Sequence, residues 1–162
     1  MSERDLIARQ LLKFLKLETI AEALYRQHLS HVPPAIKPLV REFAEVEGRH
    51  RQTFAELYTT WSKKPVPRFR FDAWCVCAAA RVFEHLGLPA IFWFECRLEA
   101  KAVKDYTAAL QWVRTSEIRT ALSTVLHDEQ AHPPLKEVLQ TFREDEKEHI
   151  RRMKKYITRK KR

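Results

Sequence analysis

Apolar residues recur at alternating three- and four-residue intervals along most of this 162-residue chain, which is the spacing of amphipathic helices. The pattern predicts a first helix over residues 6–29 and a second over residues 39–58. Pro33-Pro34 separates them, and Pro34 suits the first turn of the second helix. Residues 63–67 form the clearest loop, because two prolines follow two lysines there. The chain is therefore expected to begin as a helical hairpin.

The remaining residues predict further helices. Asp72 suits the N-cap of an apolar stretch over residues 73–94, which is interrupted at Gly87. We expect a third long helix over about 89–114, a shorter helix over about 116–130, and a last helix after Pro133-Pro134. The fold class is therefore all-α, and the length suits one domain.

The net charge of +9 comes from 30 Lys and Arg against 21 Asp and Glu, which at first suggests nucleic acid or an anionic membrane as partner. However, all acids lie before His149, whereas eight Lys and Arg lie in residues 151–162. We therefore assign residues 1–150 to a near-neutral helical domain and 151–162 to a basic tail that continues the last helix. This distribution argues against nucleic acid and leaves two roles open for the tail: contact with an anionic membrane surface, or simple solvation.

The three cysteines, Cys75, Cys77 and Cys96, match no standard zinc or iron–sulfur spacing, and we interpret them as small apolar core residues. The charged start of the chain carries no secretory signal, which favours the cytoplasm. The longest stretch without a polar side chain, residues 86–94, is too short to span a bilayer. Its cluster Ile91-Phe92-Trp93-Phe94 belongs either to the core or to a peripheral contact with the inner face of the membrane.

Two sequence patterns occur twice, in the same order. The first is Leu-Glu followed by Tyr seven residues after the Glu, at Glu18/Tyr25 and at Glu99/Tyr106. The second is Phe-x3-Glu-x2-His after a Pro-Pro pair, and its Glu and His are Glu47/His50 in the first copy and Glu146/His149 in the second. We infer an internal repeat of a helical hairpin, with an insertion in the second copy.

The repeated residues suit a pair of metal ions. A Glu and a His three residues apart lie on the same face of a helix and can hold one ion between them. One Glu from each of two helices plus Glu-x-x-His from two others is the ligand arrangement of ferritin-like di-iron and di-manganese bundles. The predicted ligands are Glu18, Glu47, His50, Glu99, Glu146 and His149. Carboxylate and imidazole ligands favour two iron ions, with manganese as the alternative. The fold is therefore expected to be a ferritin-like four-helix bundle with short additional helices.

A third Glu-x-x-His pair, Glu129/His132, competes with Glu146/His149. Its distance from Glu99 is close to the distance between the first two sites in the first copy. We prefer Glu146/His149, because His132 directly precedes Pro133 and therefore lies at a helix end.

Several neighbours of the predicted ligands have two interpretations each. Glu95, one turn before Glu99, either joins the site or is solvated beside Arg97 or Lys101. Tyr25 and Tyr106 either line a substrate cavity or bind a ligand carboxylate, or they are ordinary core residues. Asp145 either orients a metal-bound imidazole or is a solvated acid. His28, His31, His85 and His127 have no assignable partner in the sequence.

With this ligand set, the chain resembles the demethoxyubiquinone hydroxylase family, which are ferritin-like di-iron monooxygenases. The resemblance rests on these segments: Glu18 with Tyr25; Glu47-x2-His50-x3-Phe54-x-Glu56-Leu57; Leu86-Gly87 with Glu99 and Tyr106; and Phe142-Arg143 through Glu146 to His149. Two features depart from the family. Leu17 stands where the family usually has Gly before the first ligand, and the interval from Glu99 to Glu146 is longer by about one short helix.

The resemblance implies an enzyme that uses O2 at two iron ions to hydroxylate the ring of a lipophilic quinone, with the six residues named above as ligands. Electrons are expected from an external donor, because two glycines cannot form a dinucleotide-binding Gly-x-Gly-x-x-Gly motif. Two alternatives stay open. One is another ferritin-like di-iron or di-manganese oxidase, ferroxidase or peroxidase. The other is a metal-free helical module that binds partners through its basic tail.

Overall fold

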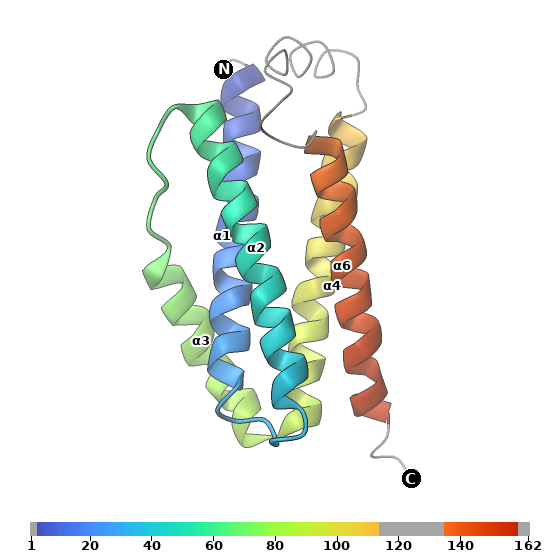
Figure 1. Cartoon of the computed structure of the whole chain (residues 1–162). Helices are drawn as coiled ribbons and strands as arrows, with labels where there is room; N and C mark the ends of the chain where they lie inside the picture. The colour runs from blue at the N-terminus through green and yellow to red at the C-terminus, as the bar shows by residue number, and fades with distance from the viewer. Residues whose placement is uncertain (1–2, 114–134, 159–162) are drawn as a thin grey trace.

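A computed structural model describes residues 3–113 and 135–158, and every regular element in these ranges is a helix. Four helices are long: α1 (Glu3–His28), α2 (Lys37–Ser62), α4 (Leu88–Val113) and α6 (Leu135–Thr158). They lie side by side, and the shorter α3 (Arg70–His85) covers the outer side of α1 (Figure 1). The predicted all-α class is confirmed.

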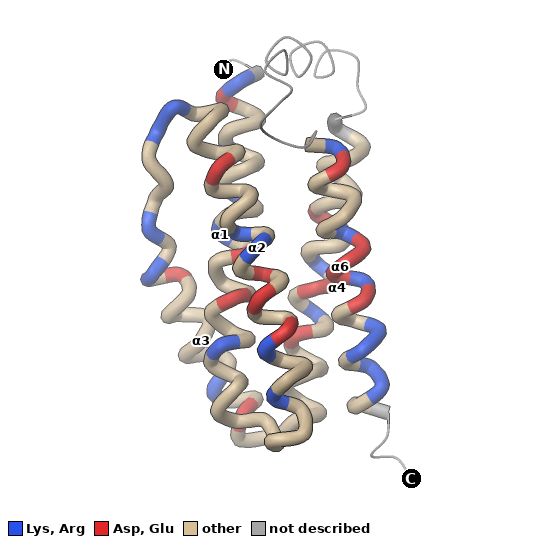
Figure 2. The backbone as a smooth tube through the Cα atoms, in the orientation of Figure 1, with Lys and Arg blue, Asp and Glu red and all other residues tan. Residues whose placement is uncertain are grey.

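The long helices pack as two pairs, α1 with α2 and α4 with α6, and these pairs are the two copies of the sequence repeat. Two apolar clusters hold the pairs together. One surrounds Phe14, Phe54 and Tyr106, and the other surrounds Tyr25, Phe43 and Phe92. Acidic residues gather at mid-height of the four long helices, and basic residues predominate on the last part of α6 (Figure 2). The layer between the two clusters is therefore where the acids lie.

The sequence located the helices well, but two of the proposed starts are wrong. α2 begins at Lys37 with Pro38 in its first turn, so Pro34 belongs to the preceding turn. The N-cap residue of α3 is Phe69, whereas Asp72 lies inside the first turn and forms an ion pair of 2.6 Å with Lys16 on α1. A long-range ion pair thus replaces the local cap. The break at Gly87 is confirmed, because its φ of 86° ends α3 before α4 starts.

The interpretation of the cysteines as core residues is wrong for Cys75 and Cys77, whereas Cys96 packs against the apolar cluster around Tyr25, Phe43 and Phe92. Cys75 is exposed, and Cys77 and Cys96 are half-buried. For Cys75 and Cys77 the physical reason is that α3 lies on the outside of α1 and buries only Ala80 fully. For the Ile91–Phe94 cluster the core alternative is confirmed at Ile91 and Phe92, which have no exposed surface, whereas Trp93 is 49% exposed.

Three predictions fall outside the described residues: the helix over 116–130, the competing pair Glu129/His132, and the end of the basic tail. The described part of the tail continues α6, as predicted, and its Arg152 forms an ion pair with Glu42 of α2 at 2.5 Å. Within the described ranges no helix is long and apolar enough to cross a membrane.

Candidate metal centre

The six predicted ligands come together between the four long helices, although they are spread over 131 positions of the sequence, from 18 to 149. α1 and α4 each contribute one Glu, and α2 and α6 each contribute a Glu-x-x-His pair. All six side chains are buried: Glu18, Glu47, His50, Glu99, Glu146 and His149. In each pair the spacing of three places both side chains on the inner face of one helix.

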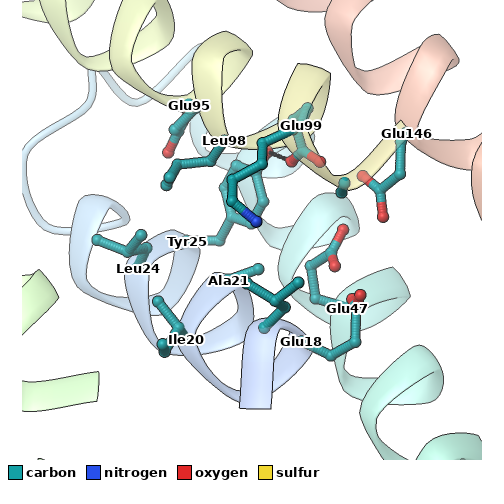
Figure 3. A pocket seen from close by; sticks show the side chains of 13 residues that line it. Glu18, Ile20, Ala21, Leu24, Tyr25, Glu47, Glu95, Leu98, Glu99 and Glu146 are labelled. Carbon is teal, nitrogen blue, oxygen red and sulfur yellow. Dashed lines mark hydrogen bonds between the residues drawn. The ribbon is translucent and has the colours of Figure 1, made fainter. Parts of the chain in front are cut away.

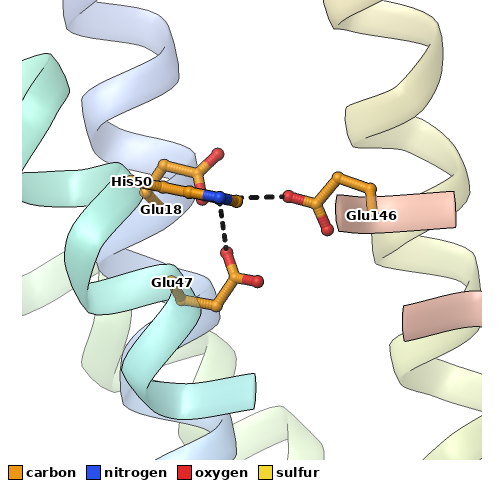
Figure 4. Close-up of side chains that lie close together, drawn as sticks. All are labelled: Glu18, Glu47, His50 and Glu146. Carbon is orange, nitrogen blue, oxygen red and sulfur yellow. Dashed lines mark ion pairs between the residues drawn. The ribbon is translucent and has the colours of Figure 1, made fainter. Parts of the chain in front are cut away.

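The six residues form two overlapping clusters, each able to hold one metal ion. One contains Glu18 and His50, the other contains Glu99 and His149, and both contain Glu47 and Glu146. Within each cluster the ligand atoms lie within 4.8 Å of one another. Figure 4 shows His50 between Glu47 and Glu146, with its Nδ1 3.5 Å from Glu146 Oε1 and 3.8 Å from Glu47 Oε2. Two shared carboxylates with one further Glu and one His on each side match the ligand arrangement expected for a pair of metal ions.

The donor atoms that face this space are available for ligands. Both carboxylate oxygens of Glu47 and of Glu146 are buried without a hydrogen-bond partner, and so are Glu18 Oε2 and the Nδ1 atoms of His50 and His149. Buried polar atoms in a folded protein are nearly always satisfied, and an unsatisfied group costs about 1–3 kcal/mol. Seven such atoms around one space fit a site that is completed by two divalent cations.

The two copies of the repeat exchange contacts through their tyrosines. Tyr25 of α1 donates a hydrogen bond to Glu99 of α4, and Tyr106 of α4 donates one to Glu18 of α1. Both tyrosines are buried. Each hydroxyl therefore holds the unshared carboxylate of the opposite copy, which confirms the interpretation that these tyrosines hydrogen-bond candidate ligand carboxylates.

The repeated phenylalanines also contact residues of the opposite copy. Phe142 stacks on His50 with a centroid distance of 3.7 Å, and Phe43 lies 4.3 Å from the ring of His149. Each Phe lies four residues before the Glu of its own copy and covers the imidazole of the other copy. Reciprocal contacts of this kind fix the direction in which both imidazoles present Nδ1 to the centre.

The environments of the two imidazoles differ in one respect. Asp145 Oδ2 of α6 lies 3.0 Å from His50 Nε2, the nitrogen that faces away from the centre. The position that corresponds to Asp145 in the first copy is Val46, which has no carboxylate. The prediction that Asp145 contacts a candidate ligand imidazole is confirmed, and the imidazole is His50 rather than the neighbouring His149.

Burial keeps protons on two of the carboxyls when no cation is present. Burial raises the pKa of Glu18 to about 8, and the nearby Glu47 carboxylate adds to this rise. Burial likewise raises the pKa of Glu146 well above its usual value, with Glu47 and Glu99 acting in the same direction. Four carboxyls in one dry space repel one another when all are ionised, so some remain protonated.

Contacts with the carboxyls keep a positive charge on the two histidines, because they raise the pKa of each imidazole. Burial opposes a positive charge on His149, but contacts with Glu146, Glu47 and Glu99 outweigh it and raise the pKa of His149 to about 12. The pKa of Glu47 is lowered, because His149 and His50 outweigh the effect of its burial. The metal-free centre thus balances its charge with protons, which incoming cations have to displace.

A narrow cavity of about 50 Å³ adjoins the candidate centre between α1 and α4, enough for a few water-sized molecules (Figure 3). Its apolar lining comes from both helices: Leu17, Ile20, Ala21, Leu24, Leu98 and Ala102. Its acidic lining consists of Glu18, Glu47, Glu99 and Glu146 of the clusters together with Glu95. Glu95 is buried, so the proposal that it is solvated beside Arg97 or Lys101 is wrong.

The sequence did not identify His28 as the partner of Glu95. His28 Nδ1 lies 2.5 Å from Glu95 Oε1, and both side chains are buried. Their separation of 67 positions in the sequence leaves no local pattern that reveals the pair. One indication was available: Glu95 lies one helical turn before Glu99 and therefore on the same face of its helix.

Comparison with known proteins gives this centre no relative. No protein-family model matches the chain, and no match was found among curated proteins or solved structures. The functional argument therefore depends on the geometry and on the residues themselves.

Proposed function

We propose that this protein is a ferritin-like di-iron monooxygenase that hydroxylates a quinone-type ring with O2. The observation that carries the proposal is the pair of four-residue clusters that share Glu47 and Glu146. In this proposal Glu18 and His50 complete one iron site, and Glu99 and His149 complete the other. Six carboxylate and imidazole donors favour iron over metals that seek thiolates, with manganese as the alternative.

The chemistry divides between the metal and the chain. When bound, the two iron ions supply O2 binding and electron transfer. The chain supplies fixed ligand positions, because Tyr25 and Tyr106 hold two carboxylates and Asp145 holds one imidazole. It also supplies the apolar cavity between α1 and α4, which limits the access of water to the centre.

Hydroxylation of a ring carbon by O2 inserts one oxygen atom into a C–H bond and reduces the other to water. This balance requires two electrons and two protons for each turnover. The electrons come from an external donor or enter with the substrate. The lipophilic substrate would approach beside the half-buried Leu17, Ile20 and Leu98, which would have to move apart because the cavity of about 50 Å³ is too small for a ring.

The test is anaerobic loading with ferrous iron, followed by a reductant, O2 and a quinone precursor, with the product mass measured. We expect about two iron ions per chain and a product heavier by one oxygen atom. Glu47→Ala, with its helix content checked by circular dichroism, serves as the control that lacks a shared ligand.

Other outcomes assign the protein to another class. Iron that is oxidised by O2 without a hydroxylated product indicates a ferroxidase or another oxidase. Turnover of hydrogen peroxide indicates a peroxidase. A chain that binds neither iron nor manganese contradicts the metal centre and favours an interaction module that uses the basic tail.

A further inference from the structure

A second buried polar cluster lies beside the candidate metal centre, at the end of α1. Its members come from three helices: His28 from α1, Glu84 from α3 and Glu95 from α4. His28 has no exposed surface, and the side chains of Glu84 and Glu95 are only 4% and 2% exposed. None of the three belongs to the two four-residue clusters.

Successive contacts in this cluster form a row of polar side chains that leads from solvent to the cavity. His31 is 44% exposed, and its Nδ1 lies 3.3 Å from Glu84 Oε1. The same oxygen lies 3.7 Å from His28 Nε2, and His28 Nδ1 lies 2.5 Å from Glu95 Oε1. Glu95 in turn lines the cavity that adjoins the centre (Figure 3).

We propose that His31, Glu84, His28 and Glu95 form a proton-transfer chain that connects solvent with the cavity beside the metal centre. The inference rests on the proposed function, since the formation of water from O2 consumes two protons in that cavity. An imidazole between two carboxylates can accept a proton at one ring nitrogen and release one from the other. Such a chain delivers protons without opening the cavity to bulk water.

Two atoms of the cluster are left free to carry the transfer. His28 Nε2 and Glu95 Oε2 are buried and have no hydrogen-bond partner. The distance of 3.7 Å between His28 Nε2 and Glu84 Oε1 is longer than a hydrogen bond. One of the two side chains therefore has to shift slightly before a proton can pass. Gln27 Nε2 holds Glu84 Oε1 at 2.6 Å and keeps this carboxylate at the entrance.

The internal repeat argues against packing as the reason for these residues. The position that corresponds to Glu95 in the first copy is Phe14, and the position that corresponds to His28 in the second copy is Ala109. Both belong to the apolar cluster at the opposite end of the molecule. The repeat therefore accepts apolar side chains at the equivalent positions of the other copy, and a buried polar pair generally gains little stability over apolar residues.

The groups around Glu95 give its carboxyl a pKa that suits a proton donor. Burial raises the pKa of Glu95 to about 7, against the opposing effect of His28. Glu99 and His149 also act on Glu95, and Tyr25 lies near it on α1. A carboxyl that titrates near neutral pH is suited to pass protons on at physiological pH.

The test compares Glu95→Gln and His28→Ala with His85→Ala, which removes an exposed histidine at the end of α3. Iron content is measured first, and we expect about two ions in every variant. We expect hydroxylation to fall about 100-fold in Glu95→Gln and His28→Ala but not in His85→Ala. The solvent deuterium isotope effect rises in the two slow variants, and added imidazole restores part of the rate of His28→Ala.

Normal rates in both variants overturn the chain and leave the proposed function standing. A lower rate with an unchanged isotope effect also overturns it, because it indicates a structural role. Glu95→Gln preserves the size of the side chain, so it decides the question where His28→Ala fails to fold.

If the unsubstituted protein does not turn over, the proposed function fails and a second measurement tests the chain. In the protein without added metal, infrared titration should show a carboxylic-acid band that titrates near neutral pH and is missing in Glu95→Gln. The absence of this band from the unsubstituted protein overturns the chain.

Discussion

Asp145 Oδ2 lies 3.0 Å from the Nε2 atom of His50, on the side of the ring that faces away from the centre, although 95 residues separate the two. A carboxylate behind an imidazole fixes the ring and raises its basicity as a ligand, and the loss of such a partner costs about 10–100-fold in metal affinity. The first copy of the repeat has Val46 at the position of Asp145. The two candidate sites are therefore unequal.

We expect Asp145→Ala to lower the affinity for one of the two metal ions by about 10–100-fold and to leave the affinity for the other ion unchanged. Anaerobic titration with ferrous iron measures both affinities. The matched control is Glu144→Ala, since Glu144 is exposed and pairs only locally with Arg143 and Lys147 among the ion pairs of the described residues. Equal weakening of both ions by Asp145→Ala would contradict the assignment of this carboxylate to the His50 site.

The carboxylates that the two clusters share predict a difference in metal stoichiometry. Glu47→Ala removes a ligand of both ions, whereas Glu18→Ala removes a ligand of one. At iron concentrations that just saturate the unsubstituted protein, we expect no bound ion in the first variant and about one in the second. Mass spectrometry under native conditions counts the ions, with the exposed Glu45→Ala as control. One tightly bound ion in Glu47→Ala would show that the ligands are not shared in this way.

The positions of the candidate ligands were predictable because a weak motif occurs in both copies of the repeat. A single Glu-x-x-His pair occurs by chance in a chain with this many Glu and His residues. Glu47/His50 and Glu146/His149 stood out because each has the same Phe and the same Pro-Pro pair before it. Helical periodicity then placed each pair on one face of its helix.

The exchanged contacts could not be predicted, because spacing along one helix does not identify the partner on another. The seven-residue interval put Tyr25 on the same face as Glu18, yet its hydroxyl binds Glu99 of the other copy. The place of α3 posed the same problem: composition favoured a buried Cys75, but this residue is exposed on a helix that packs against the outside of α1 and α4. Both outcomes depend on how helices are arranged, which is a long-range property.

The hydroxyl of Tyr106 is expected to contribute to stability beyond the packing of its ring. In Tyr106→Phe the buried carboxyl of Glu18 loses its donor, which should lower the free energy of unfolding of the metal-free protein by about 1–3 kcal/mol. Urea denaturation measures the change. Tyr156→Phe, a half-buried tyrosine beside Phe92, is the control. If both variants are equally stable, the tyrosine serves only as a core residue.

Metal binding should release protons and strengthen as the pH rises. Glu18 keeps its proton up to a pKa of about 8 in the metal-free centre, and His149 keeps its proton up to about 12. Both have to lose protons to act as ligands, so the apparent affinity for zinc or iron increases from pH 6 to pH 8. Calorimetry in buffers with different ionisation enthalpies measures the number of protons released. Affinity that is independent of pH would contradict these protonation states.

Protonation of Glu18 should stabilise the folded protein in the absence of metal. This contribution to stability falls as the pH rises, whereas the affinity for metal increases. Its pKa is raised from 4.5 to about 8 on folding, so the folded state binds this proton more tightly than the unfolded state. The contribution of Glu18 is complete below pH 4.5 and is lost as the pH rises through 8. Glu18→Gln, which cannot ionise, should flatten the decline in the midpoint of urea denaturation over this range. Parallel declines in both proteins would show that another group controls it.

The outer face of α3 provides a better test of membrane contact than the Ile91–Phe94 cluster. Phe71, Trp74 and Val82 are 75%, 66% and 62% exposed and lie on one face of the helix, and Leu86, directly after its end, is 68% exposed. By contrast, Phe92 is fully buried, so its replacement would test folding rather than binding. An exposed apolar stripe of this kind is typical of surfaces that contact a membrane or another protein, so it is the surface to test.

We expect the double variant Phe71→Ser/Trp74→Ser to reduce co-sedimentation with anionic liposomes by at least about tenfold, because each buried aromatic side chain contributes about 1.5–3 kcal/mol. Leu6→Ser, which alters an exposed apolar residue on α1, is the control and should bind like the unsubstituted protein. Binding that persists in the double variant but disappears in high salt would place the contact on basic residues instead, such as those at the end of α6. Binding that persists under both conditions would rule out both surfaces.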